Sequence, residues 1–186
     1  GPLRRGRLSS RQKMTLSAVR SALFNEVLAA RVADGSWQRA LSGDLIQLDG
    51  SNSFFGPVTE LDSSLDARLN ALEVHPTGPL PGADSLPSGL DDPALERVLP
   101  DSTALEHAVL RRHPDYLELL ARLDVRSARR ALRTPARELR WQRISETSMR
   151  LEFTLDRGSY ATELLGRLGH FQQAQREKSA PLQVNP

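Results

Sequence analysis

The sequence lacks cysteine altogether and is poor in lysine and in aromatic residues. The absence of cysteine excludes a disulfide framework and thiolate metal sites, and it is typical of proteins in the reducing cytoplasm. No apolar run has the length that a membrane-spanning helix requires, and the chain does not open with a signal-peptide pattern. We therefore expect a cytoplasmic protein without a membrane partner.

The motifs of several enzyme classes are also missing. The chain contains no phosphate-binding loop, no Gly-x-Gly-x-x-Gly and no Gly-x-Ser-x-Gly. The four histidines, His75, His107, His113 and His170, do not have the spacing of metal ligands. We therefore expect neither a metal enzyme nor one with a catalytic triad, and we interpret the acidic residues in the middle of the chain as caps, turns and helix faces.

Arginine, by contrast, is abundant and unevenly distributed. Of the 25 basic residues, 23 are arginine. Residues 1–31 carry seven basic and one acidic side chain, residues 32–109 three and thirteen, and residues 110–150 eleven and five. Arginine forks suit phosphate groups and stack on bases, so two basic blocks around an acidic one are consistent with a phosphate-binding face. Helices that simply carry solvated arginines explain the same distribution equally well.

One long amphipathic helix is predicted for residues 16–32. Its apolar side chains recur at three- and four-residue steps, which predicts one buried face. They are Leu16, Val19, Leu23, Val27 and Ala30, with Phe24 and Leu28 beside them. Arg20 and Arg31 are expected to lie off this face. The basic residues 3–13 are interpreted as a connector into the helix, and a serine or Thr15 as its N-cap.

The middle of the chain is expected to hold a hairpin and several helices. Asp49-Gly50, between two apolar runs in residues 43–58, is a strong hairpin signal. Thr59 is predicted to cap a helix that ends before His75-Pro76. Residues 76–100 hold six of the twelve prolines and are predicted to form a long irregular loop. Further helices are expected over residues 102–112, 114–123 and 127–133.

After Pro135 the sequence pattern changes to that of a sheet. Residues 138–143 and 149–155 alternate as strands do, and Ala161–Leu168 has the pattern of a final helix. Two strands and one helix do not form a stable sheet domain alone, so residues 136–171 are predicted to complete a sheet whose other strands lie upstream of Gly1. The polar residues 172–186 are expected to form a flexible tail.

Four segments, in their order along the chain, resemble the tRNA pseudouridine synthase D (TruD) family. The first is Ser17-Ala-x-x-Ser-Ala-Leu-Phe-Asn-x-x-x-Ala-x-Arg31 in the long helix. Gly43-Asp44 at the start of the hairpin and Leu80-Pro-Gly82 follow, and residues 150–162 match a strand and turn near the end of the family. The resemblance covers nearly the whole chain, as the family's C-terminal half.

This resemblance implies a fold and an activity. The family embeds a helical insertion domain in the pseudouridine synthase catalytic fold, whose last strands and helix return after the insertion. We therefore predict an α+β fold. Residues 1–135 are expected to be a mainly α-helical insertion domain with a small β-hairpin and a basic connector over residues 1–13, and residues 136–171 the C-terminal part of the catalytic domain. The implied function is a tRNA pseudouridine(13) synthase, an isomerase of a uridine in tRNA that needs no cofactor.

The resemblance also implies where the chemistry lies. The family's catalytic aspartate lies in a Gly-x-Lys-Asp segment that this chain does not contain, so the chain alone is predicted to be inactive without a missing N-terminal catalytic half. Asn52-Ser-Phe-Phe-Gly56 imitates another family motif but lacks its Gln-Arg-Phe-Gly extension. Tyr160 matches the aromatic of the family's Gly-Ser-Phe-Ala-Thr turn and is expected to contact the flipped uracil. The residues expected to bind tRNA are Arg4, Arg5, Arg7, Arg11, Lys13 and Arg20.

A second interpretation, from a different class, stays open. A non-catalytic helical module that binds RNA or a protein partner would use the same arginines without chemistry. Under that interpretation, Tyr160 is an ordinary aromatic that closes the end of a strand. A Gly-x-Lys-Asp segment in the coding sequence upstream of Leu3 would favour the synthase.

Overall fold

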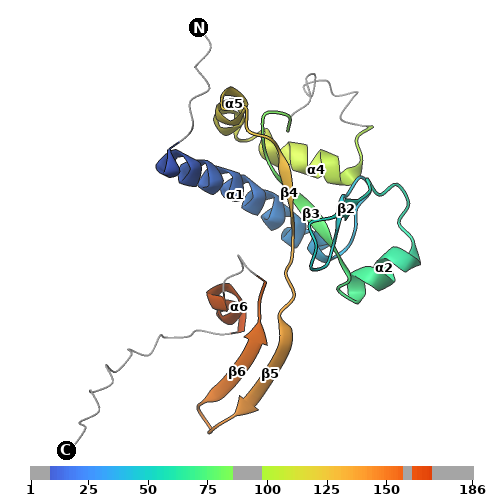
Figure 1. The fold of residues 1–186 in the computed structure, drawn as a ribbon. Coiled ribbons are helices and arrows are strands. Elements are labelled where there is room, and N and C mark those ends of the chain that lie inside the picture. Colours follow the sequence, from blue (N-terminus) through green and yellow to red (C-terminus); the bar gives the residue numbers. More distant parts are fainter. Residues whose placement is uncertain (1–8, 86–97, 157–160, 169–186) are drawn as a thin grey trace, which may run out of the picture. The chain divides into compact units, whose positions relative to one another are not determined.

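The computed structural model describes residues 9–85, 98–156 and 161–168, which form two compact units, Gly1–Arg133 and Thr134–Pro186 (Figure 1). The elements of the first unit are α1 (Ser10–Ala33), η1 (Ser36–Gln38), β1 (Ile46–Leu48), β2 (Phe54–Phe55), α2 (Ser63–Asn70), β3 (Val74–Leu80), α4 (Asp101–Leu110), α5 (Pro114–Arg122) and β4 (Ala128–Ala131). The second unit holds β5 (Arg137–Arg143), β6 (Met149–Thr154) and α6 (Ala161–Leu168).

The long helix α1 begins earlier than its apolar pattern predicts. Ser9 is the N-cap of a capping box: its Oγ accepts from Gln12 N at 3.2 Å, and Gln12 Oε1 accepts from Ser9 N at 2.8 Å. These two bonds satisfy backbone donors that the first helical turn otherwise leaves unpaired. The predicted connector over residues 1–13 is therefore wrong from Ser10 onward, and its first eight residues lie outside the described part of the chain.

The buried face of α1 is the one that the sequence predicts, with one addition. Leu23, Phe24 and Val27 are buried, and Leu23 packs with leucines of α4 and α5, against which Leu16 and Val19 also lie. The addition is Arg31, which is only 1% exposed and continues the Leu23 and Val27 stripe by one helical turn. The expectation that Arg31 lies off this face is wrong, because the buried Asp44 carboxylate forms an ion pair with its guanidinium.

The first unit contains a four-stranded antiparallel sheet in the order β2-β1-β3-β4. The predicted hairpin is present as β1 and β2, but it is one edge of this larger sheet. The α+β class is confirmed, whereas the description of the β structure in residues 1–135 as a small hairpin is wrong. Two local predictions fail with it. The predicted loop over residues 76–100 opens with most of β3, and the predicted helix over residues 127–133 contains β4.

Strand β3 contains Pro76 and Pro79 and still forms, because different parts of it pair with the two neighbouring strands. Residues 74–76 of β3 pair with β1, and residues 77–80 pair with β4. Pro76 lies opposite Ile46, and its carbonyl accepts from Leu132 N at 2.9 Å. Pro79 lies beyond the residues that pair with β1. Six of the seven β3 residues are buried, so burial outweighs the local preference of proline for a loop.

The helices of the first unit follow the prediction more closely. Helix α2 carries Leu65 and Leu69 on its buried face, although Asp62, not Thr59, caps it by accepting from Leu65 N at 2.7 Å. Helices α4 and α5 lie within two residues of their predicted bounds. No helix in the described residues is both long enough and apolar enough to cross a membrane.

In the second unit, the strands and the helix form as predicted. Strands β5 and β6 pair in antiparallel fashion, and α6 has the predicted bounds. Leu151 and Phe153 alternate with exposed residues along β6. None of the described side chains of this unit is fully buried, and the Trp141 side chain on β5 is 68% exposed. The two strands therefore form a sheet without a core of its own among the described residues.

Candidate functional site

Four arginines of the first unit direct their guanidinium groups into the fold. They are Arg20 and Arg31 on α1, Arg129 on β4, and Arg133 two residues after β4. Each binds backbone carbonyls, carboxylates or other side chains at distances within hydrogen-bonding range. The basic residues of the two blocks thus divide into those that hold the fold together and those that remain exposed.

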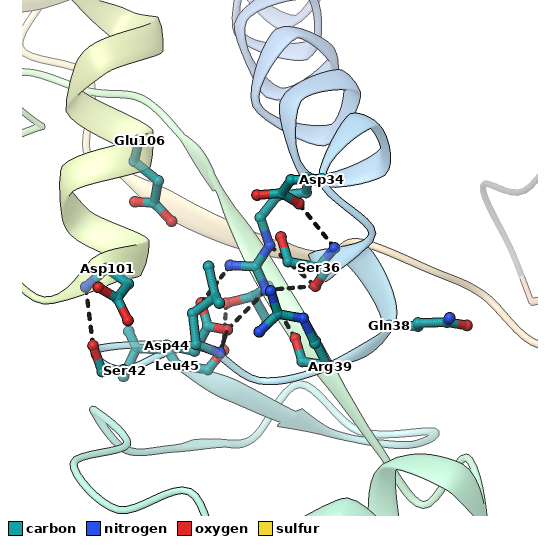
Figure 2. Close-up of polar contacts among 12 residues, drawn as sticks. Asp34, Ser36, Gln38, Arg39, Ser42, Asp44, Leu45, Asp101 and Glu106 are labelled. Carbon is teal, nitrogen blue, oxygen red and sulfur yellow. Dashed lines mark hydrogen bonds and ion pairs between the residues drawn. The ribbon is translucent and has the colours of Figure 1, made fainter.

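Arg31 and Asp44 form a bidentate ion pair with almost no exposed surface. Arg31 Nη1 donates to Asp44 Oδ1 at 3.0 Å and Nη2 to Oδ2 at 2.9 Å, and the two side chains are 2% and 0% exposed. Arg31 also donates to the carbonyls of Ser36 and Arg39, which lie beside the Asp44 carboxylate in Figure 2. Leu41 N donates to Asp44 Oδ2 at 2.8 Å. The buried pair is therefore satisfied by hydrogen bonds as well as by opposite charge.

The Gly43-Asp44 motif owes its composition to this packing. Gly43 has φ +83°, and a Cβ there would lie 2.4 Å from Pro100 Cβ and 2.9 Å from Ser102 Oγ. Its lack of a side chain lets the start of α4 approach the turn before β1. Ser42 Oγ accepts from Asp101 N at 3.0 Å, which ties the same turn to α4 (Figure 2). The motif is thus structural within the first unit.

Arg129 occupies a second internal network, between β3, β4 and α4. Its Nε donates to Thr77 Oγ1 at 2.7 Å, its Nη2 to Thr77 O at 2.8 Å, and its Nη1 to Glu106 Oε2 at 3.1 Å. Burial raises the pKa of the Glu106 carboxyl, and the hydrogen bonds and charge of Arg129 oppose that shift. The Glu106 carboxylate and the Arg129 guanidinium therefore form a structural ion pair.

A third network assigns a structural role to His75. Arg133 Nε donates to His75 Nδ1 at 3.2 Å, so the ring proton lies on Nε2 and is donated to Asp49 Oδ1 at 2.8 Å. Arg133 Nη2 also donates to the carbonyl of Val74 at 3.1 Å, and burial lowers the pKa of its guanidinium. Both ring nitrogens of His75 are thus engaged, and no group of acidic residues and histidines in the described residues has the arrangement of a metal site.

The remaining cluster lies where α1 meets β3 and β4. Arg20 Nε donates to Pro81 O at 2.9 Å, and its Nη2 donates to Leu80 O at 2.9 Å and to Arg126 O at 3.1 Å. The Arg130 guanidinium lies over the Phe24 ring, 5.2 Å from the ring centroid. Burial lowers the pKa of Arg20, and the nearby Arg130 charge lowers it further. Two cations from different basic blocks therefore lie close together here.

The structure places only some of the predicted site residues. Arg11 and Lys13 are exposed in the first turns of α1. Arg20 is half-buried and bound to carbonyls. Tyr160 and the predicted RNA-binding residues Arg4, Arg5 and Arg7 lie outside the described residues. Sequence reasoning overlooked the Phe24–Arg130 contact, because the helix predicted over residues 127–133 concealed the strand alternation that directs Arg130 and Arg129 to opposite faces of β4.

Comparison with known proteins gives one consistent family. The family model described as tRNA pseudouridine synthase D (TruD) matches residues 8–168. The tRNA pseudouridine synthase D of Pseudomonas entomophila is 44% identical over 153 residues, which are 82% of this chain and 40% of that protein. The protein of the same name from Hydrogenovibrio crunogenus is 38% identical over 157 residues, 84% of this chain and 42% of that protein.

A solved structure has a similar fold. It comes from Methanosarcina mazei, is described as a candidate tRNA pseudouridine synthase D, and superposes with a TM-score of 0.56 at 23% identity. The similarity covers 78% of this chain and 35% of that one. The chain thus spans less than half the length of these two curated relatives and of this structure.

Proposed function

The chain belongs to the tRNA pseudouridine synthase D (TruD) family, and on that premise we propose that it is the C-terminal part of a tRNA pseudouridine(13) synthase. Such an enzyme converts one uridine of tRNA to pseudouridine. The observation that carries the proposal is the family match over residues 8–168, because it runs through both units of the chain. A module that merely binds RNA or protein gives no reason for the strands and helix of the second unit to match as well.

The nucleophilic aspartate of the reaction is proposed to lie outside this chain. No Gly-x-Lys-Asp segment occurs in its 186 residues. Several carboxylates of the described first unit already have structural partners: Asp44 binds Arg31, Asp62 caps α2, and Glu106 binds Arg129. The Asp44 carboxylate has no exposed surface, so a ribose carbon cannot reach it. Pseudouridine formation would therefore require a catalytic half outside this chain. The relatives are more than twice as long as the segment that matches, which is consistent with such a half.

The second unit is proposed to complete the catalytic sheet of that half. Strands β5 and β6 form an isolated pair among the described strands, and large apolar side chains such as Leu139 and Trp141 are more than half exposed. A two-stranded sheet is at best marginally stable alone, and exposed apolar residues favour burial against further strands. The proposed role of Tyr160, just before α6, is to contact the uracil that the enzyme flips out of its stack.

tRNA binding is proposed for the basic residues at the start of the chain. They are Arg4, Arg5, Arg7, Arg11, Lys13 and Arg20. The exposure of Arg11 and Lys13 on α1 supports this proposal, because counterion release requires cations that a phosphate can reach. Phosphate contacts of this kind position an RNA without reading its sequence.

The basic residues before Met14 are called the basic arm. Its test uses the 186-residue chain and an unmodified tRNA transcript. Replacing Arg4, Arg5, Arg7, Arg11 and Lys13 together with glutamine should weaken binding and reduce the salt dependence of log Kd by about 0.7 to 0.9 for each phosphate that is no longer bound. A control variant replaces Arg39, Arg68 and Arg122, which are outside the arm. If both variants keep the parent slope, the arm does not bind tRNA.

The test of the missing nucleophile uses the same two molecules. The chain is incubated in excess over unmodified tRNA, and pseudouridine is quantified by mass spectrometry of the digested RNA. We expect no product even in a single turnover, since no carboxylate of the family's nucleophile motif is present. Pseudouridine formed by the isolated chain would contradict this placement of the nucleophile.

A further inference from the structure

Arg20 is a guanidinium that the fold has already oriented. Three backbone carbonyls, those of Leu80, Pro81 and Arg126, accept from its Nε and Nη2. These bonds use three of the five donors of an arginine fork and leave the two Nη1 donors without a hydrogen bond to the described residues. A ligand that reaches Nη1 therefore meets a side chain whose conformational entropy has already been lost in folding.

Arg130 is oriented by a different contact. Gly78 of β3, which pairs with Arg130 of β4, brings the sheet close to α1: a Cβ on Gly78 would lie 3.0 Å from Phe24 Cε2. The Phe24 ring fills this space, and the Arg130 guanidinium lies over the ring at 5.2 Å from its centroid. Arg130 remains exposed although its guanidinium is positioned. The Arg130 guanidinium forms no hydrogen bond to the described residues, so its donors stay available to an anion while the Phe24 ring holds its position.

The charge at this position is not balanced by carboxylates of the described residues. Neither Arg20 nor Arg130 forms an ion pair with them, and the Arg130 charge contributes to lowering the pKa of Arg20. The Asp84 carboxylate is engaged elsewhere, because it accepts from Ser127 N and Oγ. Arg129 and Arg133, from the same basic block as Arg130, have their donors directed into the fold.

We propose that Arg20 of α1 and Arg130 of β4 together bind one backbone phosphate of the tRNA. A phosphodiester suits the site because it carries one negative charge and accepts hydrogen bonds from two arginine edges at once. The inference rests on the proposed function, and it joins Arg20, already among the residues proposed to bind tRNA, with Arg130 in one phosphate site at the α1–β4 junction. It also gives a role to the two basic blocks on either side of an acidic one, since the fold brings Arg20 and Arg130 together.

The experiment measures tRNA binding by the 186-residue chain between about 50 and 200 mM KCl. Arg130→Gln should weaken binding several-fold at the lowest salt and reduce the slope of log Kd against log salt by about 0.7 to 0.9, the value for one phosphate. Arg130→Lys keeps the charge and should retain the parent slope. Arg122→Gln is the matched control, because Arg122 is exposed and paired with Glu118 on α5; its slope should equal that of the parent.

A double variant tests whether the two arginines share one phosphate. Arg20→Gln combined with Arg130→Gln should reduce the slope by no more than about 0.9, as for a single phosphate. If Arg20→Gln lowers the melting temperature strongly, the Arg130 comparison alone decides. An Arg130→Gln slope equal to that of Arg122→Gln overturns the site, as does a parent chain that does not bind tRNA. The first of these results leaves the synthase proposal standing, because that proposal is tested by pseudouridine formation.

Discussion

Asp44 shows how a buried ion pair can account for a residue of the Gly43-Asp44 motif. Its two carboxylate oxygens accept three hydrogen bonds, two from Arg31 and one from Leu41 N, in a site without solvent exposure. Removing one member of such a pair leaves an uncompensated buried charge, which costs more than the pair itself contributes. The motif therefore indicates stability and not chemistry.

Asp44→Asn should accordingly lower the free energy of unfolding by about 3 to 5 kcal/mol, because Arg31 remains buried and charged without its counterion. Urea denaturation followed by circular dichroism measures this loss. The control is Glu118→Gln, which removes a carboxylate from an exposed pair with Arg122 and should cost less than about 1 kcal/mol. Equal effects of the two substitutions would contradict a structural role for the buried pair.

At Tyr160 the expected effect is on catalysis. In the complete enzyme, Tyr160→Phe keeps the ring and should retain activity. Tyr160→Ala removes the stacking surface and should reduce kcat/KM about ten- to a hundredfold, equivalent to about 1 to 3 kcal/mol. Pseudouridine formation and thermal melting are measured for both variants. Parent activity in Tyr160→Ala rules out the uracil contact, and loss of folding in that variant identifies an ordinary structural aromatic.

Among the elements, β3 lies between β1 and β4 in the sheet, and its close packing against α1 depends on Gly78. The hypothetical Cβ at this position lies 2.9 Å from a Leu132 methyl and 3.0 Å from the Phe24 ring. A side chain at residue 78 would therefore require the Leu132 methyl and the Phe24 ring to shift.

Gly78→Ala should therefore destabilise the first unit by about 1 to 3 kcal/mol through overpacking. Gly166→Ala in α6 is the contrasting variant, since a Cβ there meets nothing within 4 Å. It should leave stability unchanged or raise it by up to about 1 kcal/mol, as expected for alanine in a helix. Melting temperatures of the two variants compare them directly. A Gly78→Ala protein as stable as the parent would show that α1 and β3 do not pack as closely as this.

The elements also show which features local pattern can predict. Helices α1, α4, α5 and α6 and strands β5 and β6 have a clear periodicity, and the sequence predicts them within a few residues except at the start of α1. Strand β3 carries two prolines and a glycine, and β4 is rich in arginine, so neither has a local strand signal. Both are stabilised by pairing between residues that are far apart in the sequence, such as Thr77 and Ala131.

The same limit applies to the candidate site. The arginine blocks and the matching motifs are visible in the sequence. Whether an arginine is exposed, however, depends on partners that are distant in the sequence. Arg31 binds Asp44, Arg129 binds Glu106, and Arg20 binds the carbonyl of Leu80 at the end of β3. Charge counts do not distinguish these residues from Arg130.

At the scale of the whole molecule, the two units differ in self-sufficiency. The first has a sheet, internal arginine networks and apolar clusters of its own. The second consists of a strand pair and a helix without a fully buried described side chain. Since the chain spans less than half the length of its curated relatives, this difference is expected if the second unit completes a sheet supplied by the remainder.

The most direct test of the central claim joins this chain to the part that it is proposed to complete. In the Pseudomonas entomophila relative, the matching C-terminal segment is replaced by this chain, and pseudouridine at tRNA position 13 is mapped after incubation with an unmodified transcript. The truncated relative and the isolated chain serve as controls. We expect product from the chimera and none from either part alone. Product from the isolated chain, or none from a folded chimera that binds tRNA, would contradict the central claim.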